Sequence, residues 1–199
     1  MIVLPDKELV VFDLEFTDVA LAEASGTYPD IVEVGAVKID CELSVVDTFS
    51  TLVQPIALEQ FTEYSESLTK IKPYELRSAP MWSEVWRDFA EFTRFASVKL
   101  CSWGIAQDLA VLRRAYKTNK LGYPHSNLSV DAMTFVYAWA AIEGRNVTRR
   151  WSLDAACEFF EIERGQSHRA LPDALDTVRI LQALGGSDLE DSNYAIVEI

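Results

Sequence analysis

The stretch that most constrains the fold is Leu9 to Thr17 (LVVFDLEFT), an apolar run that ends by presenting two acids. Its branched and aromatic residues predict a buried β-strand that leads into Asp13 and Glu15. Because strand side chains alternate between two faces, both carboxylates should leave the same face of this strand. Two neighbouring anions repel each other, and oxygen ligands of this kind suit Mg²⁺ or Mn²⁺. The stretch therefore predicts a core strand with a cation site at its end, although a solvated acidic strand end would also fit.

The order of the remaining elements indicates the fold class. Two strand-like stretches, 31–39 and 43–53, follow with a short link between them, which favours an antiparallel start to the sheet. Strand-like stretches at 98–103 and 128–130 then alternate with helical ones. The helices are expected at 65–69, 81–95, 108–116, 133–142, 152–160 and 173–184, with polar loops at 18–30 and 161–169. This order predicts an α/β fold, a mixed five-stranded sheet with helices on both faces, as in a ribonuclease H-like architecture.

Length and composition indicate one domain with an ordinary core. A chain of 199 residues fits a single domain, which we place at residues 1–185, followed by an acidic tail at 186–199. No apolar run is long enough to span a membrane, and no export signal is visible, so we expect a cytoplasmic protein without a membrane partner. The three cysteines, Cys41, Cys101 and Cys157, are far apart and are expected to be buried, reduced and free of zinc.

The net charge limits how the chain could bind nucleic acid. A formal charge of −13 argues against broad binding to long nucleic acid, which depends on neutralising phosphates with Lys and Arg. Bound cations could still offset the negative field locally. Seven basic residues gather in two segments: Arg113, Arg114, Lys117, Lys120, Arg145, Arg149 and Arg150. We expect solvated helix faces there, with a phosphate-contact surface as the less favoured alternative.

Three further residues could join the acids of the first strand. Asp108 lies near the start of a predicted helix, just after Gly104, where a lone acid could simply complement the positive helix end. His168 lies five residues before Asp173 in the stretch SHRALPDALDT, which leads from a polar loop into the last helix. The neighbours of His168 are polar, so the alternative to a functional histidine is an exposed and idle one.

Taken together, these blocks resemble the DEDDh family of 3′-to-5′ exonucleases. The shared features are FDLEFT, the Asp-Leu helix start and the HRALPDA stretch, in the same order across residues 10 to 183. Weaker landmarks include LTKI at Leu68 to Ile71, where the exoribonuclease branch usually has LTGI. This chain therefore carries Lys70 where the family commonly has glycine.

The resemblance implies roles for five residues: Asp13, Glu15, Asp108 and Asp173 as acids, and His168 as the general base. In that reading the acids hold two divalent metal ions, Mg²⁺ or Mn²⁺, which activate water and stabilise the leaving 3′ oxygen. With an unperturbed pKa near 6.5, histidine can take the proton of the water near neutral pH. The implied reaction removes nucleoside 5′-monophosphates from the 3′ end of single-stranded RNA or DNA.

Other candidate residues are weaker. Phe16 and Thr17 follow the metal acids and could contact the terminal nucleotide by stacking and through a hydroxyl, although packing explains Phe16 equally well. Asp131 is better explained as the N-cap of the next helix. Asp176, one turn beyond Asp173, is expected to be solvated. His125 is assigned no role.

Two other functions compete with the exonuclease. The first is a catalytically silent ribonuclease H-like domain that binds nucleic acid or a protein partner, and such a domain should have lost acids or the histidine. The second is a ribonuclease H-type endonuclease, which would explain the acids but not the histidine before the last one. The sequence does not indicate any particular protein partner.

Overall fold

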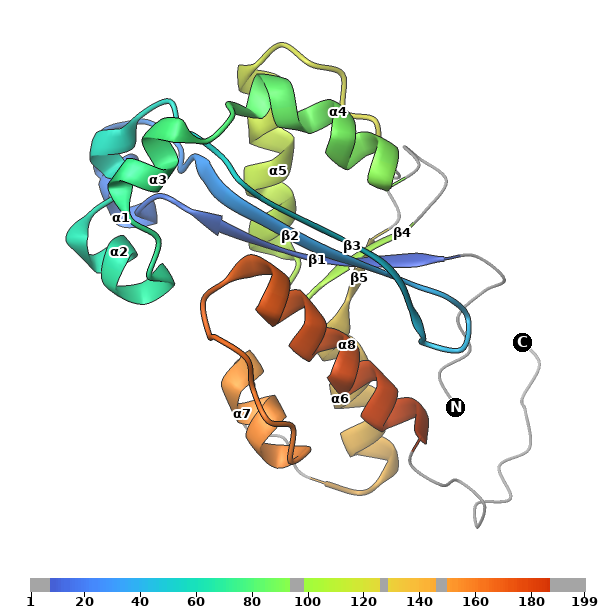
Figure 1. The fold of residues 1–199 in the computed structure, drawn as a ribbon. Helices are drawn as coiled ribbons and strands as arrows, with labels where there is room; N and C mark the ends of the chain where they lie inside the picture. The colour runs from blue at the N-terminus through green and yellow to red at the C-terminus, as the bar shows by residue number, and fades with distance from the viewer. Residues whose placement is uncertain (1–7, 94–98, 126–128, 146–149, 187–199) are drawn as a thin grey trace.

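A five-stranded mixed sheet forms the centre of the molecule (Figure 1). The structure, a computed structural model, describes residues 8–93, 99–125, 129–145 and 150–186. The strands lie in the order β3-β2-β1-β4-β5, with β1–β2 and β2–β3 antiparallel and β1–β4 and β4–β5 parallel. Their bounds are β1 Leu9–Phe16, β2 Ile31–Ile39, β3 Val45–Leu52, β4 Lys99–Ser102 and β5 Ser129–Asp131. The predicted antiparallel start and the mixed sheet are both confirmed.

Helices cover both faces of this sheet, as predicted (Figure 1). Helices α4 (Trp82–Phe92) and α5 (Ala106–Thr118) lie on one face. Helices α6 (Ala132–Ile142) and α8 (Ala170–Gly186) lie on the other, and α7 (Leu153–Phe159) packs against α8. Alternation along β1 joins the two layers, because its even-numbered apolar residues pack against α4 and α5 and its odd-numbered ones against α8.

Two short helices lie in stretches where we did not expect them. We expected a polar loop at 18–30, and an irregular stretch at 56–79 apart from the short helix at 65–69. Helix α1 (Val19–Ala24) lies inside the predicted loop 18–30, and the carboxylate of Asp18 caps it by accepting a hydrogen bond from the Leu21 N–H at 3.0 Å. Helix α3 (Pro73–Ser78) begins at Pro73, a position where a missing N–H costs nothing. A 3₁₀ turn (Leu58–Gln60) and α2 (Glu63–Thr69) complete this part of the chain.

Lys70 shows why a glycine is common at its position. The residue ends α2 in a left-handed conformation, with φ 63° and ψ 6°. Glycine adopts this conformation without strain, whereas a side chain with a Cβ pays a steric cost. Lys70 therefore adopts, at the end of α2, the backbone conformation that glycine favours.

Gly35 allows the last helix to approach the sheet closely. It lies in β2 opposite Asp13, in the strand pair next to the predicted site. A Cβ atom added there would lie 2.1 Å from the Leu171 nitrogen and 2.2 Å from the Ala170 carbonyl carbon. Only a residue without a side chain fits beneath the first turn of α8.

Some smaller expectations need correction. Cys41 is exposed, whereas Cys101 and Cys157 are buried as expected. We also expected the helix at 133–142 to be buried because its sequence is apolar all round, but Ile142 in α6 is 63% exposed. Phe95 and Val98 lie outside the described residues, and so does the proposed tail from 187 onward. None of the described helices combines the length and the apolar character that crossing a membrane requires.

Candidate active site

The two acids of β1 continue its odd-numbered series toward α8. Leu9 and Val11 belong to the apolar cluster beneath α8, and Asp13 and Glu15 come next on the same face. They lie where β1 passes the first turn of α8, so the run of apolar side chains ends in carboxylates. The predicted shared face of Asp13 and Glu15 follows directly from this strand geometry.

Asp108 and Asp173 each lie in the first turn of a helix. Asp108 is 7% exposed at the start of α5, and its Oδ2 accepts a hydrogen bond of 2.6 Å from the hydroxyl of Ser102 at the end of β4. Asp173 is 8% exposed in the first turn of α8, and its Oδ2 accepts a hydrogen bond of 3.1 Å from the His168 N–H. Both positions place a carboxylate at the positive end of a helix.

His168 lies beside two of these acids. The side-chain ligand atoms of Glu15, His168 and Asp173 all lie within 4.8 Å of one another. The backbone of His168 is left-handed, with φ 58°, and the hydrogen bond to Asp173 helps to hold this unusual conformation. One cleft of about 510 Å³ has all five predicted residues in its walls: Asp13, Glu15, Asp108, His168 and Asp173.

The acids are held close enough to raise one another's pKa. Burial raises the pKa of Asp13 well above its ordinary value, and the charges of Asp108 and Glu15 raise it further. Burial and then the charge of Asp173 raise the pKa of Glu15 to about 8. Burial raises the pKa of Asp108 to about 7, although the hydrogen bond from Ser102 acts in the opposite direction. Burial likewise raises the pKa of Asp173, against the lowering effect of Arg164.

This donor set fits divalent cations. Crowded, partly desolvated carboxylates are costly to ionise side by side, and a bound cation would remove that cost. Hard oxygen donors with one histidine nearby suit Mg²⁺ or Mn²⁺. The four acids are therefore the residues that could hold metal.

A partly buried ion pair fixes the loop that carries His168. The guanidinium of Arg169 donates to both carboxylate oxygens of Glu33, with Nη2–Oε1 at 2.7 Å and Nε–Oε2 at 3.0 Å. The same carboxylate accepts the Ala170 N–H at 3.0 Å and so caps the start of α8. Glu33 lies opposite Glu15 across β1 and β2. The ion pair therefore ties the start of α8 to the sheet next to the acids.

A second arginine binds the other side of the same helix. Arg164 pairs with Asp173 and Asp154, and its Nε donates to Asp176 Oδ2 at 3.1 Å. Asp176 is 0% exposed and also pairs with Arg179. The expectation that Asp176 is solvated is therefore wrong, because two arginines satisfy its charge inside the fold.

The weaker candidates have mixed positions. Phe16 and Thr17 both line the cleft, but Phe16 also packs on the core, and the Thr17 hydroxyl already accepts the Asp30 N–H at 2.9 Å. Asp131 caps α6 as predicted, since its Oδ1 accepts the Met133 N–H at 3.0 Å. His125 is buried, with its ring nitrogens bonded to Thr93 and Tyr116, and burial lowers its pKa to about 4.

Sequence reasoning missed several residues of this site. Glu33 could have been noticed as an acid inside an otherwise apolar strand, and Ser102 as a hydroxyl at the end of another. Gln107 lines the cleft without a local signal, and Arg150, which belongs to a basic segment that we expected to be solvated, lines it as well. Arg164 was not recognisable, because its partners lie in two different helices.

Solved structures share this fold. Cell-death related nuclease 4 (CRN-4) superposes with a TM-score of 0.76 at 15% identity, covering 89% of this chain and 63% of that one. The nuclease domain of 3′hExo, described as a DEDDh family member bound to rAMP, gives a TM-score of 0.69 at 18% identity, covering 88% and 90%. At these identities the likeness establishes the fold alone, which is ribonuclease H-like as predicted.

Sequence comparison defines the family. The RNase_T exonuclease model matches residues 10–181, so the chain belongs to this family of DEDD 3′-to-5′ exonucleases, as the sequence resemblance implied. The chain is 31% identical to a PolC-type DNA polymerase III of Caldanaerobacter subterraneus subsp. tengcongensis, over 97% of this chain but 13% of that protein. It is 28% identical to the "Probable 3'-5' exonuclease KapD" of Bacillus subtilis, over 88% of this chain and 83% of that one.

Proposed function

We propose that this chain hydrolyses single-stranded nucleic acid from the 3′ end with divalent metal ions, releasing nucleoside 5′-monophosphates. One observation carries the proposal: four acids and His168 line one cleft where β1, α5 and α8 meet. KapD is described as a probable 3′-5′ exonuclease, and a solved relative holds rAMP, which is a nucleoside monophosphate. The domain boundary at residue 185 stays a prediction.

The residues of the cleft divide the chemistry between them. Asp13, Glu15, Asp108 and Asp173 would hold the metal ions, which when bound polarise the attacking water and stabilise developing negative charge. His168 would accept a proton from that water through a ring nitrogen. Because Asp173 also accepts the backbone N–H of His168, the acid fixes the position of the base.

The cleft also has groups suited to the end of the substrate. The Phe16 ring can pack against a terminal base, and the Thr17 hydroxyl can still donate one hydrogen bond. Stacking and one hydroxyl contact suit ribose and deoxyribose alike. The sugar preference is therefore decided by experiment.

The test is a time course on 5′-labelled RNA and DNA of equal sequence, with Mg²⁺, Mn²⁺ or EDTA. We expect a metal-dependent ladder that shortens from the 3′ end, and the faster substrate identifies the preferred sugar. Asp173→Asn removes one charged ligand at nearly constant shape and should lower kcat about 10²- to 10³-fold. Asp88→Asn is the matched control, because Asp88 is an exposed acid on α4 and should retain wild-type kcat.

Other outcomes would contradict the proposal in different ways. Internal cuts without a ladder would favour the endonuclease. Tight binding of the labelled strand without cleavage in any metal would favour the catalytically silent domain. A wild-type rate for folded Asp173→Asn would show that this acid is not part of the site.

A further inference from the structure

A second groove adjoins the active-site cleft. It holds about 500 Å³ and runs between α1, the turn at Tyr28 and Pro29, and helix α5. We call it the α5 groove. Val19 and Gln107 line both the α5 groove and the active-site cleft, so the two hollows adjoin at the start of α5. A chain molecule whose end lies in the cleft could therefore reach this adjoining groove.

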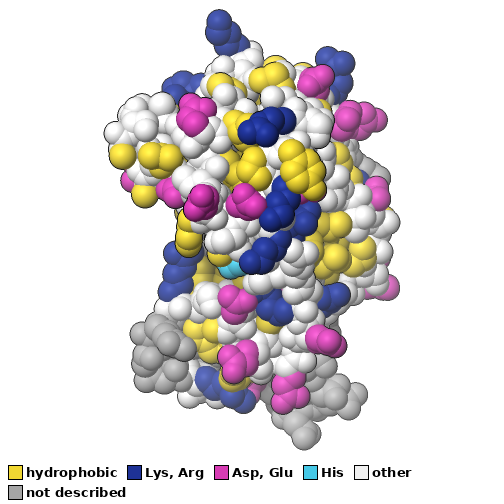
Figure 2. All heavy atoms as spheres, turned by 60° about the vertical axis from the view of Figure 1, so that its left-hand side comes forward, with side chains coloured by type: hydrophobic (Ala, Val, Ile, Leu, Met, Phe, Trp, Pro, Cys, Tyr) yellow, Lys and Arg dark blue, Asp and Glu magenta, His cyan; other side chains and the backbone are white. Residues whose placement is uncertain are grey.

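The wall formed by α5 is basic. Gln107, Ala110, Arg114 and Lys117 line the groove at spacings of three and four residues, which place them on one helix face, and Arg113 lies beside them. From Gln107 to Lys117 the helix rises by about 15 Å, which is enough for several phosphates of a single strand. Figure 2 shows one face of the molecule, on which Lys and Arg side chains lie among acidic ones around a histidine.

Arg113 and Arg114 lie over the rings of Tyr123 and Tyr28, at 5.6 and 3.6 Å from the ring centroids. In the described part of the chain no carboxylate forms a salt bridge with Arg113, Arg114 or Lys117. Glu23 is the acid that lines the groove with them. In a chain of net charge −13, unpaired cations in one groove create a local field that favours an anion.

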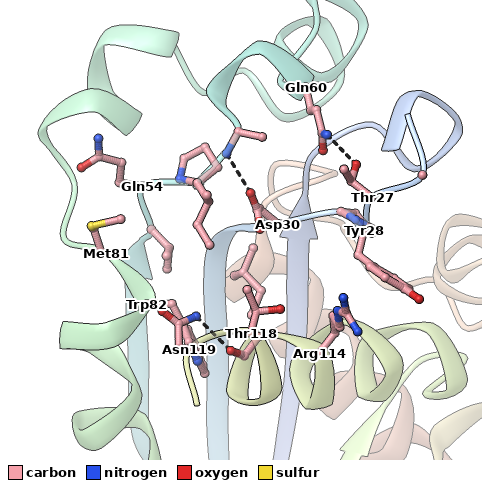
Figure 3. Close-up of a pocket in the computed structure, with 18 residues that line it drawn as sticks. Thr27, Tyr28, Asp30, Gln54, Gln60, Met81, Trp82, Arg114, Thr118 and Asn119 are labelled. Atoms are coloured by element: carbon pink, nitrogen blue, oxygen red, sulfur yellow. Dashed lines mark hydrogen bonds between the residues drawn. The ribbon is translucent and has the colours of Figure 1, made fainter. Parts of the chain in front are cut away.

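An aromatic ring is held beside the cations. The Arg114 guanidinium lies 3.6 Å from the centroid of the Tyr28 ring, and Tyr28 is 54% exposed. Figure 3 shows this pair at one side of a neighbouring pocket, with Arg114 on α5 and Tyr28 on the loop before β2. An exposed ring fixed by a cation offers a flat surface on which a base can stack.

From this arrangement we propose that the α5 groove binds the strand on the 5′ side of the bond that is cut. Arg113, Arg114 and Lys117 would contact its phosphates, and Tyr28 would stack on one base. The inference rests on the proposed function, because it requires the 3′ end to lie in the cleft. It assigns the basic segment of α5 to substrate binding instead of to a solvated face.

The test compares a long with a short substrate. Arg113→Ala/Lys117→Ala removes two exposed cations from the helix, and Arg77→Ala/Arg87→Ala removes two exposed cations elsewhere. The first substrate is a 12-nucleotide strand, and the second is a dinucleotide, which has no phosphate upstream of the bond that is cut. We expect the groove variant to lose at least about tenfold in kcat/KM on the 12-mer and to keep its kcat/KM on the dinucleotide. The slope of log binding constant against log salt concentration for the 12-mer should become shallower by about 1.4, at about 0.7 for each of the two lost phosphate contacts.

Binding can be measured separately from turnover. Fluorescence anisotropy of a labelled 12-mer in EDTA gives Kd without cleavage, so the inference is tested even if the wild-type protein hydrolyses neither substrate. A groove variant with the same Kd and kcat/KM as the Arg77→Ala/Arg87→Ala control would overturn the inference. Equal losses on the 12-mer and the dinucleotide would also overturn it, because the groove would then act on the cleft itself.

Discussion

The sharpest test of how α8 positions the site is the addition of a single methyl group at Gly35. In Gly35→Ala the new Cβ would lie 2.1 Å from the Leu171 nitrogen, whereas ordinary contact begins near 3.4 Å. The obstacle is backbone, so the first turn of α8 must move away from the sheet by about 1.3 Å. That turn carries Asp173, and the residues just before it carry His168. A misplacement of about 1 Å in a catalytic group can cost about 100-fold in rate, which is the loss of kcat that we expect.

The assay for Gly35→Ala is kcat on the labelled strand together with thermal unfolding by circular dichroism. Overpacking should cost about 1–3 kcal/mol, or roughly 2–12 °C in Tm for a chain of this size. Gly122→Ala is the control, because a Cβ there meets no atom within 4 Å. If Gly35→Ala kept wild-type kcat and Tm, the close approach of α8 would not position the site.

Two further predictions concern the residues of the cleft. His168→Ala should lower kcat about 10²- to 10⁴-fold while Mn²⁺ still raises Tm, and an unchanged kcat across neutral pH would remove His168 as the base. Burial and like charges raise the pKa of Glu15 to about 8 and of Asp108 to about 7, so the metal-free folded protein holds protons there that the unfolded chain releases at lower pH. Its Tm in EDTA should therefore fall as pH rises from about 5 to 8.5, and Mn²⁺ should raise Tm more at pH 8.5 than at pH 5; a Tm that rises with pH would contradict this sign.

The elements with a strong local pattern were the ones that the sequence could predict. β2 matches its predicted bounds, 31–39, and α4 follows the aromatic spacing from Trp82 onward. Helix α1 was missed because six residues carry too little periodicity, and its start depends on one capping carboxylate. We predicted that the last helix starts at residue 173, three residues later than α8 does, because Pro172 suggested a helix boundary. Proline is tolerated in the first turn of a helix, which is where Pro172 lies.

The sequence predicted five residues that share one cleft, but it did not predict the residues that support them. The five predicted residues lie in short blocks next to recognisable elements, and the structure brings them into one cleft, while their roles stay predictions. Their supports depend on pairs that are distant in sequence: Arg169 and Glu33 are 136 residues apart. Asp176 was misjudged for the same reason, since only the fold brings Arg164 to it. Periodicity indicates which face of a helix or strand a residue lies on, but it does not identify the distant residue that contacts it there.

Substitutions in β2 should have two different effects, depending on which face of the sheet the substituted side chain takes. Val34 points into the core beneath α4 and α5, so a smaller residue there would weaken folding. Glu33 and Gly35, its direct neighbours, face α8 and determine where the start of that helix lies. Substitutions at these adjacent positions should therefore be separable by assay. A change at Val34 should lower the amount of folded protein, whereas changes at Glu33 or Gly35 should lower the rate per folded molecule. A strand that supplies none of the five residues proposed for catalysis would then determine how well they are positioned.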